Sequence, residues 1–324
     1  MSPSNDESEA PYRVVVSDSK VIDLAGQSPL EAVDATVERT GVKTPAEIIE
    51  ATADADALVV DAGAQVARPV FEAVDSLSVV GRAGTGVDNI DVEAARDHGV
   101  PVVNVPDYAA EEVATHALAL LLACLRRVVA YDRSIWDGEW NWTVGRPVER
   151  LAGGTVGVVG FGTIGRSFAR KLRGFDVDVC AYDPYVEDAE MADRGVQKVS
   201  FGKLLRDSDA VSVHAPLTAE TRGMIDGEAL AATPDHAVLV NTGRGPIVDE
   251  NALATALRSG ELGAAGLDVR ETEPPESSAL SDLDTVVSTP HAAWYSERSR
   301  EELNQTVAAD VARILRGEPP HNPV

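Results

Sequence analysis

A glycine-rich turn between a strand-like run and a helical run constrains the fold of this chain more than any other feature. The run TVGVV precedes the turn, RSFARKLRGF follows it, and the turn itself reads Gly160-Phe161-Gly162-Thr163-Ile164-Gly165. The first glycine permits a tight turn, the second lets the backbone approach a pyrophosphate, and the third lets helix and strand pack closely. The helix N-terminus then offers unpaired N–H groups to an anion. This context predicts a dinucleotide-binding domain, with a purely structural turn as the alternative.

The strand after this turn ends at Asp183, about 20 residues further along the chain. A carboxylate at this place can accept hydrogen bonds from the adenosine ribose diol and would repel a 2'-phosphate. No arginine follows directly, so NAD is favoured over NADP. A turn residue before Pro184 is the alternative role for Asp183.

Short β-branched runs alternate with helical stretches along the whole chain, which predicts parallel α/β architecture. A first set of strands is expected at residues 13–17, 57–61, 77–80 and 101–105. A second set of six strands is expected to begin at Thr155, Val177, Ala210, Ala237, Ala264 and Thr285. A last helix is expected around residues 298–316.

Residues 111–131 form a helical run that is apolar nearly all round. Such a helix is expected to be buried between domains or subunits, and a homodimer is the favoured reason. Residues 136–151 carry Trp136, Trp140 and Trp142 among Gly and Pro, which indicates a surface excursion that would pack on a partner subunit.

The charge balance is strongly acidic, with 53 acidic and 28 basic residues and a net charge of -25. Such a field disfavours direct binding to nucleic acid and to anionic membranes. The acidic excess is spread along the chain, and most cations are Arg, since the few lysines are Lys20, Lys43, Lys171, Lys198 and Lys203. We interpret this as a halophilic surface whose self-repulsion is screened by salt, with an ordinary acidic protein as the alternative.

The remaining composition predicts a cytoplasmic protein. Residues 1–10 have neither the basic nor the apolar region of a targeting signal, and the apolar run 117–125 is about half of what a bilayer span requires. Cys124 and Cys180 suit a reducing compartment better than a disulfide framework. No Cys or His pair has the ligand spacing of a structural zinc site, so no metal is expected.

Three segments of the second set each end a strand and begin a loop, so they should meet at the carboxyl edge of one sheet. They are Asn241-Thr-Gly-Arg244, Asp268-Val-Arg-Glu-Thr-Glu273-Pro and Thr289-Pro-His291-Ala-Ala-Trp294. With GRAGTGVDNID at 81–91, NVPDYAAEEVA at 104–114 and HAPLTAET at 214–221, the chain resembles the D-isomer-specific 2-hydroxyacid dehydrogenases over nearly its whole length. YDPY at 182–185 and HAAWYSE at 291–297 look like the C-terminal-binding-protein branch, corepressors that keep this fold and bind NAD, whereas HAPLT is the ordinary enzyme form.

The resemblance implies two doubly wound parallel-sheet α/β domains. A flavodoxin-like substrate domain would use residues 1–112 plus 297–324, and a Rossmann NAD domain at 113–296 would be inserted into it. The expected reaction is reversible hydride transfer between NAD(H) and a small or medium 2-oxo or 2-hydroxy acid.

The physical needs of that reaction assign three catalytic residues. Arg244 offers a planar, permanently charged group that holds the substrate carboxylate and polarises its carbonyl. His291 can donate a proton on reduction and accept one on oxidation. Glu273 would hydrogen-bond the imidazole and favour its protonated form. Glu271 and Glu276 compete for that role, and family spacing selects the Glu before Pro274. A structural ion pair, a core histidine and a solvated loop carboxylate are the respective alternatives.

The resemblance also implies contacts around the reacting atoms. In the first set, Gly84-Thr85-Gly86 resembles the loop that receives the substrate carboxylate, and Arg82 has either a substrate role or an interface role. Asp268 would receive the nicotinamide carboxamide, and Trp294 would cover the substrate pocket, with ordinary structural roles as the alternatives. Other expected cofactor contacts come from the loops after three strands: His214, Pro216 and Thr221 on the first, Thr242, Gly243 and Arg244 on the second, and His291 on the third.

Three other functions are alternatives to this reaction. A scaffold that binds partner peptides in an NAD-dependent way is the alternative from another class, and HAPLT and short tails favour an enzyme instead. For phosphoglycerate dehydrogenase, a Trp294 roof disfavours a phosphorylated substrate, and no further regulatory domain is expected after Val324. Formate chemistry does not require a proton-shuttling Glu and His pair.

Overall fold

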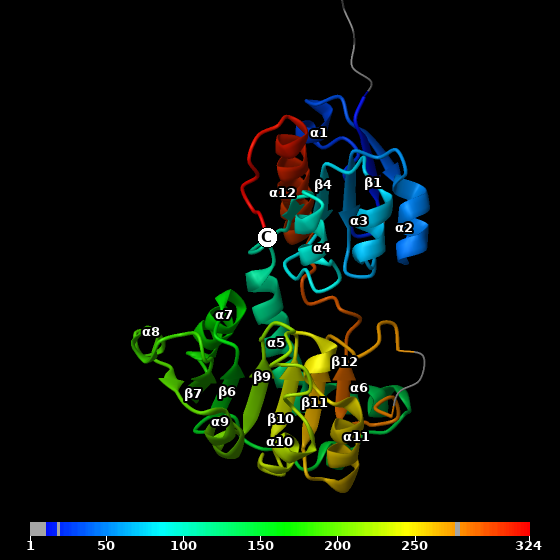
Figure 1. Ribbon diagram of the computed structural model, residues 1–324. Coiled ribbons are helices and arrows are strands. Elements are labelled where there is room, and N and C mark those ends of the chain that lie inside the picture. The colour runs from blue at the N-terminus through cyan, green and yellow to red at the C-terminus, as the bar shows by residue number, and fades with distance from the viewer. Residues whose placement is uncertain (1–10, 18–19, 276–278) are drawn as a thin grey trace, which may run out of the picture. The chain divides into compact units, whose positions relative to one another are not determined.

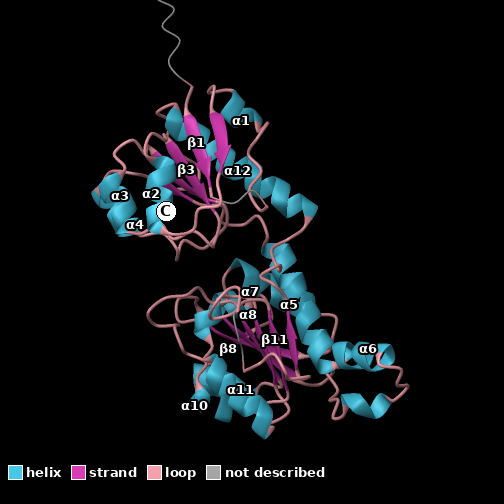
Figure 2. Ribbon diagram, turned by 90° about the vertical axis from the view of Figure 1, so that its right-hand side faces the viewer, coloured by secondary structure: helices cyan, strands magenta, loops and turns pink. Residues whose placement is uncertain are grey.

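The computed structural model describes residues 11–17, 20–275 and 279–324 (Figures 1 and 2). The chain divides into two compact units. Unit 1 comprises Met1–Tyr108 and Ser296–Val324, and unit 2 is Ala109–Tyr295. These bounds differ by a few residues from the domain limits predicted at 112/113 and 296/297.

Unit 1 is a parallel five-stranded sheet with helices on both faces (Figure 2). The strand order β2-β1-β3-β4-β5 is that of flavodoxin-like folds. Its strands are β1 (Arg13–Val16), β2 (Thr36–Arg39), β3 (Ala57–Val60), β4 (Val79–Arg82) and β5 (Val102–Val103). Its helices are α1 (Ser28–Glu31), α2 (Pro45–Thr52), α3 (Arg68–Ala73), α4 (Val92–Asp97) and α12 (Glu297–Leu315).

Helix α12 returns to unit 1 from the far end of the chain and packs closely on β4. A Cβ atom on Gly81 would lie 2.9 Å from Val307 Cγ2, so only glycine permits this approach. Val307 and Val311 are fully buried in the contact. The helix begins one residue before the predicted range, after a capping box in which Ser296 and Ser299 bond each other's backbone.

Three features of unit 1 differ from the sequence-based expectation. The edge strand β2 was not predicted, because its residues TVER are largely exposed and lack a buried face. The strand expected at 77–80 is β4 at Val79–Arg82, which places Arg82 at the end of a fully buried strand. The strand expected at 101–105 is reduced to Val102–Val103.

Unit 2 is a parallel seven-stranded sheet in the order β12-β11-β10-β9-β6-β7-β8. Counted from β6, this is the Rossmann order with one further strand at the β12 edge. The strands are β6 (Thr155–Val159), β7 (Asp178–Tyr182), β8 (Gln197–Lys198), β9 (Ala210–Val213), β10 (Val238–Asn241), β11 (Ala264–Leu267) and β12 (Val286–Ser288). The two-residue strand β8 was not predicted.

Helices cover both faces of this sheet and bury a separate apolar cluster on each (Figure 2). One cluster includes Leu120 and Phe168, and the other includes Leu204 and Leu253. The helices are α5 (Ala110–Leu125), α6 (Val128–Trp136), α7 (Thr163–Leu172), α8 (Asp188–Ala192), α9 (Phe201–Asp207), α10 (Gly227–Ala231) and α11 (Glu250–Ser259), with 3-10 turns η1 (Trp142–Gly145) and η2 (Gly245–Ile247).

The single helix predicted over 111–131 is wrong. The structure has two helices, α5 and α6, because Arg127 adopts a left-handed conformation with φ of 52° and ends the helical path. Helix α5 packs on the unit 2 sheet, where Leu120 meets Gly266 of β11. Its apolar character is therefore explained by packing within unit 2.

Among the described residues, no single helix has the length and apolar composition of a membrane span. Helices α5 and α6 have that length and composition only when taken together, and this pair is bent by 63°. No group of three His, Cys, Asp or Glu residues in the described ranges is arranged to hold a metal ion.

Candidate active site

The glycine-rich turn has the geometry that its sequence predicts. Gly160 has a φ of 87°, and a Cβ atom there would lie 2.6 Å from the backbone nitrogen of Ala215. A Cβ on Gly165 would collide with the carbonyl oxygen of Gly160, so α7 and β6 approach as closely as glycine permits. Gly162, at the N-cap of α7, has open space at its Cβ position. An exposed backbone at a helix N-terminus fits a pyrophosphate, so the turn fits the predicted dinucleotide.

Asp183 lies at the end of β7 beside this turn. One carboxylate oxygen accepts the Phe161 N–H at 2.8 Å, and the other accepts the Tyr185 N–H at 2.9 Å. Asp183 therefore does take part in the turn, as its alternative role predicts, through the bond from the Tyr185 N–H. Each carboxylate oxygen can accept more than one bond, so these contacts are compatible with a ribose role.

The loop after β9 carries three of the predicted cofactor contacts. His214 bonds Ser212 Oγ through Nε2 at 2.9 Å, and burial lowers the pKa of His214 to about 3, so the ring is neutral at pH 7. Thr221 Oγ1 donates to the Pro216 carbonyl at 2.6 Å. The hydrogen bonds of His214 and Thr221 within the chain are structural, because they hold the shape of this loop.

The loop after β10 presents Arg244. The Asn241 side chain fixes this loop with two hydrogen bonds. Its Oδ1 accepts the Gly243 N–H at 3.0 Å, and its Nδ2 donates to the Arg244 carbonyl at 3.0 Å. Thr242 Oγ1 lies 3.3 Å from His214 Nδ1, which joins this loop to the preceding one. Asn241 was not predicted to have a role beyond ending the strand.

Glu273 and His291 form a hydrogen-bonded pair. His291 Nδ1 lies 2.6 Å from Glu273 Oε2, and Glu273 Oε1 accepts the Arg270 N–H at 3.0 Å. Burial by itself would raise the pKa of Glu273, but the hydrogen bond and charge of His291, the Arg270 N–H and the charge of Arg244 outweigh burial and lower it. Glu273 therefore stays ionised beside the imidazole at neutral pH.

The turn that carries Glu273 is held by an ion pair that sequence reasoning missed. Arg270 makes two bonds to Glu250, of 2.9 and 2.7 Å, and Glu250 also accepts the Glu271 N–H. Of the two competitors for the role of Glu273, Glu271 has an exposed side chain, and Glu276 lies outside the described residues. The folded turn brings the carboxylate of Glu273 to His291.

His291 itself has a left-handed backbone, with a φ of 52°. Its N–H donates to the Asp268 carbonyl at 2.8 Å. The carboxylate of Asp268 is 1% exposed and accepts bonds from Thr289 Oγ1 and from the N–H groups of Ala292 and Ala293. Asp268 thus fixes the loop around His291, a role that the sequence did not indicate.

Trp294 follows on the same loop and packs edge-to-face on Tyr295, with ring centroids 5.5 Å apart.

The predicted substrate residues of unit 1 lie at the carboxyl edge of that unit's own sheet. Arg82 is 6% exposed and donates to the Ala83 carbonyl, Gly84 has a φ of 142°, and Thr85 Oγ1 bonds the Val105 and Pro106 carbonyls. Gly86 is half-buried at the same turn.

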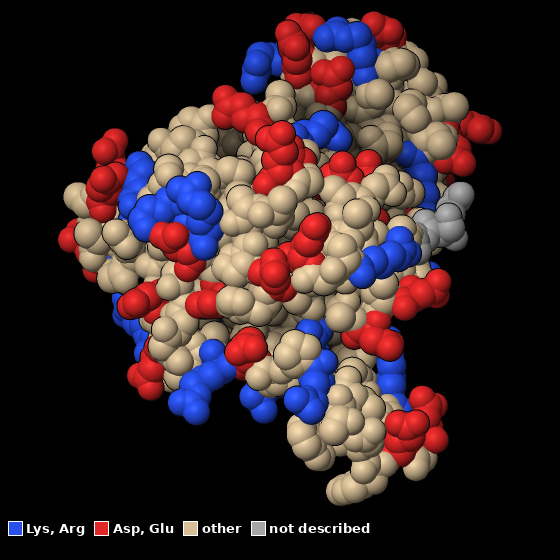
Figure 3. Space-filling model, turned by 90° about the horizontal axis from the view of Figure 1, so that it is seen from below, with Lys and Arg blue, Asp and Glu red and all other residues tan. Residues whose placement is uncertain are grey.

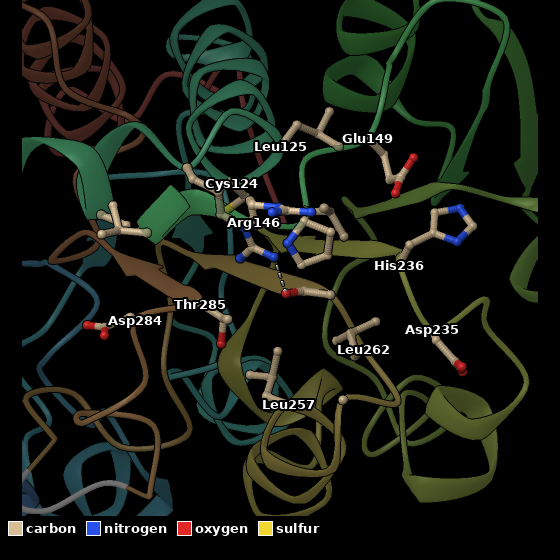
Figure 4. A pocket seen from close by; sticks show the side chains of 17 residues that line it. Cys124, Leu125, Arg146, Glu149, Asp235, His236, Leu257, Leu262, Asp284 and Thr285 are labelled. Carbon is tan, nitrogen blue, oxygen red and sulfur yellow. Dashed lines mark hydrogen bonds between the residues drawn. The ribbon is translucent and has the colours of Figure 1, made fainter. Parts of the chain in front are cut away.

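A cavity of about 280 Å³ lies at the opposite, amino edge of the unit 2 sheet (Figure 4). Its lining includes Arg127 and Arg146 and the residues that precede β10, β11 and β12. The Arg127 side chain donates to the Gly263 carbonyl at 2.9 Å. The lining contains neither Arg244, Glu273 nor His291, so this cavity is separate from the candidate site.

Comparison with known proteins identifies the family. Residues 118–293 match the NAD-binding domain of the D-isomer specific 2-hydroxyacid dehydrogenases. The chain belongs to this family. The fold is therefore that of the family, and unit 2 carries its NAD-binding domain.

Similar proteins come from archaea and bacteria. D-3-phosphoglycerate dehydrogenase of Methanocaldococcus jannaschii is 40% identical over 91% of this chain and 56% of its own length. The chain thus spans little more than half of that relative. Glyoxylate reductase of Korarchaeum cryptofilum is 42% identical over 85% of this chain and 84% of its own length. The structure of the TT0316 protein of Thermus thermophilus superposes with a TM-score of 0.87 at 33% identity, covering 96% of this chain and 99% of that one.

Proposed function

We propose that the protein is an NAD-dependent D-2-hydroxyacid dehydrogenase that interconverts a 2-oxo acid and a 2-hydroxy acid. The 2.6 Å pair of Glu273 and His291 carries the proposal. The pair lies on loops at the carboxyl edge of a dinucleotide-binding sheet, where ligands bind in such folds. Membership of a D-isomer specific family supports the D configuration of the product.

Each catalytic residue has a task that its contacts support. Since Nδ1 of His291 is bonded to Glu273, Nε2 is the nitrogen that would exchange a proton with the substrate oxygen. Arg244 would hold the substrate carboxylate and stabilise negative charge as it develops on that oxygen. NADH, when bound, would supply the hydride. We propose Gly84, Thr85, Gly86 and Arg82 of unit 1 as further substrate contacts. The proposed cofactor contacts are the glycine-rich turn, Asp183 and Asp268, together with His214, Pro216, Thr221, Thr242 and Gly243.

We propose a small or medium 2-oxo acid as substrate, with Trp294 against its side chain. Glyoxylate reductase of K. cryptofilum, which matches over most of its own length, supports a small acid. The phosphorylated alternative, 3-phosphohydroxypyruvate, is supported by the identity to phosphoglycerate dehydrogenases. The two candidate substrates differ in charge, and one assay that includes both kinds of acid distinguishes them.

The test is oxidation of NADH by the purified protein in concentrated KCl against a panel of 2-oxo acids. The panel contains glyoxylate, hydroxypyruvate, pyruvate, 4-methyl-2-oxopentanoate, phenylpyruvate and 3-phosphohydroxypyruvate. Turnover of an unphosphorylated acid supports the proposal, and turnover of the phosphorylated acid alone replaces the substrate assignment. NADH binding without turnover of any acid would favour the corepressor-like scaffold, whose partner peptides should then bind only when NAD is present.

Replacement of Asp183 should change the choice of cofactor. Asp183→Ser removes the charge that would repel a 2'-phosphate, so we expect the ratio of the Kd values for NADP and NAD to fall by about tenfold. Asp183→Asn is the matched control for the loop contacts, because it keeps an oxygen acceptor for Phe161 N–H. Titration calorimetry measures both constants. An unchanged ratio in both variants would leave Asp183 with its turn role only.

We propose a homodimer formed through the segment from α6 to η1. Trp136, Trp140 and Trp142 are 83%, 94% and 70% exposed, and a cluster of exposed tryptophans is typical of an interface. We expect light scattering to give twice the chain mass of 34.2 kDa, and the double variant Trp140→Ser/Trp142→Ser to shift it toward one chain mass. Tyr185→Ser is the control, since Tyr185 is also 80% exposed but lies after β7. Retention of the dimer by the double variant would contradict this assignment.

We propose that the acidic surface is an adaptation to concentrated salt inside the cell. On the face shown in Figure 3, acidic side chains are spread over the surface instead of forming one patch. Raising KCl from about 0.1 M to about 3 M should screen their repulsion. We expect Tm to rise by at least about 5 °C, or roughly 2 kcal/mol of stabilisation. A Tm that rises equally when an uncharged osmolyte replaces KCl would contradict the proposal, because exclusion of the solute from the protein surface would then explain the stabilisation.

We propose a cytoplasmic location, which agrees with two free, buried cysteines. Burial raises the pKa of the Cys124 thiol to about 12.

A further inference from the structure

A chain of hydrogen bonds connects helix α5 to the loop of the catalytic histidine. His116 Nε2, on α5, lies 2.9 Å from Thr289 Oγ1. Thr289 Oγ1 donates to Asp268 Oδ1 at 2.6 Å. The same carboxylate accepts the N–H groups of Ala292 and Ala293, each at 2.9 Å. These last two residues follow His291 directly, so the chain of bonds ends at the backbone that carries the imidazole.

The direction of the bonds assigns the proton on His116. A threonine hydroxyl has one proton, and that of Thr289 goes to Asp268, whose carboxylate can only accept. Thr289 Oγ1 must therefore accept from His116, and Nε2 of His116 carries a proton. His116 Nε2 also lies 3.6 Å from Asp268 Oδ1. The imidazole thus acts as a donor to a half-buried hydroxyl that is itself bonded to the buried carboxylate of Asp268.

The loop around His291 requires such support. A left-handed backbone at a non-glycine residue costs about 1–2 kcal/mol and persists only where neighbouring contacts fix it. The His291 side chain is 31% exposed, so apolar packing on all sides does not hold it. The Asp268 carboxylate fixes the backbone after His291, and Thr289 Oγ1 is the side-chain donor to that carboxylate. A loose carboxylate would allow the imidazole to move relative to the reacting oxygen.

We propose that His116 is a positioning residue for His291, acting through Thr289 and Asp268. The inference rests on the proposed function, because the task of the loop is to hold a proton donor in place. His116 does not belong to the buried face of α5, which consists of small and apolar residues such as Ala117, Leu120 and Leu121. The His116 side chain is 27% exposed, so its loss should leave the core of unit 2 intact.

The test combines NMR with kinetics on the full chain. The protein has 6 histidines, so 15N-histidine labelling gives few ring signals, which long-range 1H–15N spectra assign to tautomers. We expect a proton on Nε2 of His116, and we expect His116→Ala to shift the ring signals of His291. Thr115→Ala is the matched control, because Thr115 is an exposed neighbour on α5 whose hydroxyl donates to the Glu111 carbonyl. An unprotonated Nε2 on His116, or an unchanged His291 in His116→Ala, overturns the inference.

Kinetics give a second, independent readout. We expect His116→Ala and Thr289→Val each to lower kcat by about 10- to 100-fold with little change in KM, since a misplaced proton donor affects the chemical step. Thr289→Ser should retain most of kcat because it keeps the hydroxyl. If the two residues act as one unit, the double variant should be no slower than either single variant. Losses that multiply in the double variant would contradict the connection. Wild-type protein without turnover refutes the proposed function instead, and the NMR result then decides the His116 contact alone.

Discussion

Replacement of His291 by Gln should lower kcat for reduction of the best 2-oxo acid by roughly 10³-fold, within the 10²- to 10⁴-fold range of positioned proton donors. Glutamine keeps a polar group of similar size that can still meet Glu273, but it cannot deliver a proton to the substrate oxygen. The Kd for NADH should change by less than about threefold, because the glycine-rich turn and α7 are untouched. Stopped-flow NADH oxidation measures the first quantity, and NADH fluorescence titration measures the second.

The matched control is His236→Gln. His236 also pairs with a carboxylate, Asp209, at 2.7 Å, but the pair lies at the amino edge of the same sheet. We expect kcat of this variant to stay within about twofold of wild type. A His291→Gln enzyme with near-normal kcat would mean that water or another group supplies the proton, and the catalytic assignment would be abandoned.

Replacement of Arg244 by Lys should lower kcat/KM by about 10²- to 10³-fold. Lysine keeps the charge but loses the planar group that can bond a carboxylate and a carbonyl oxygen together. The loss should appear in both kcat and KM, since the guanidinium would bind the substrate and also stabilise the developing charge. Steady-state kinetics over a range of substrate concentrations separates the two.

Arg222→Lys provides the control for Arg244. Arg222 is an exposed arginine on the loop after β9, and its backbone N–H bonds Thr218 in an ordinary turn. This variant should have wild-type kinetics. If Arg244→Lys affects only KM, Arg244 binds substrate without polarising it, and the stabilisation of the oxygen must come from elsewhere.

Much of the fold could be predicted because its main signals are local in sequence. A strand, three spaced glycines and a helix within residues 155–172 specify the centre of the unit 2 sheet, and buried β-branched runs specify its neighbours. The edge strands β2 and β8 were missed because exposed residues such as Thr36 and Gln197 do not have the apolar pattern of a core strand. The break at Arg127 was missed because a left-handed residue has no apolar signature.

The candidate site shows the same division. The sequence placed Glu273 and His291 on loops of one sheet edge, and the structure brings them to 2.6 Å. It could not show that Asp268 binds the His291 loop, or that His116 reaches Thr289, which is 173 residues away in the chain. Contacts between residues so far apart in the chain depend on how helices and strands pack against each other. The spacing of residues in a single sequence does not contain that information.

The interrupted chain path of unit 1 also constrains the order of events during synthesis. Its five strands emerge from the ribosome first, yet α12, which covers β4 at Gly81, is translated only after the whole of unit 2. Residues 109–295 form a continuous segment with its own apolar clusters and can become compact while the earlier sheet still lacks its last helix. One face of β4 therefore stays without its covering helix for the time needed to translate more than half of the polypeptide, and transiently exposed apolar surface of this kind favours aggregation.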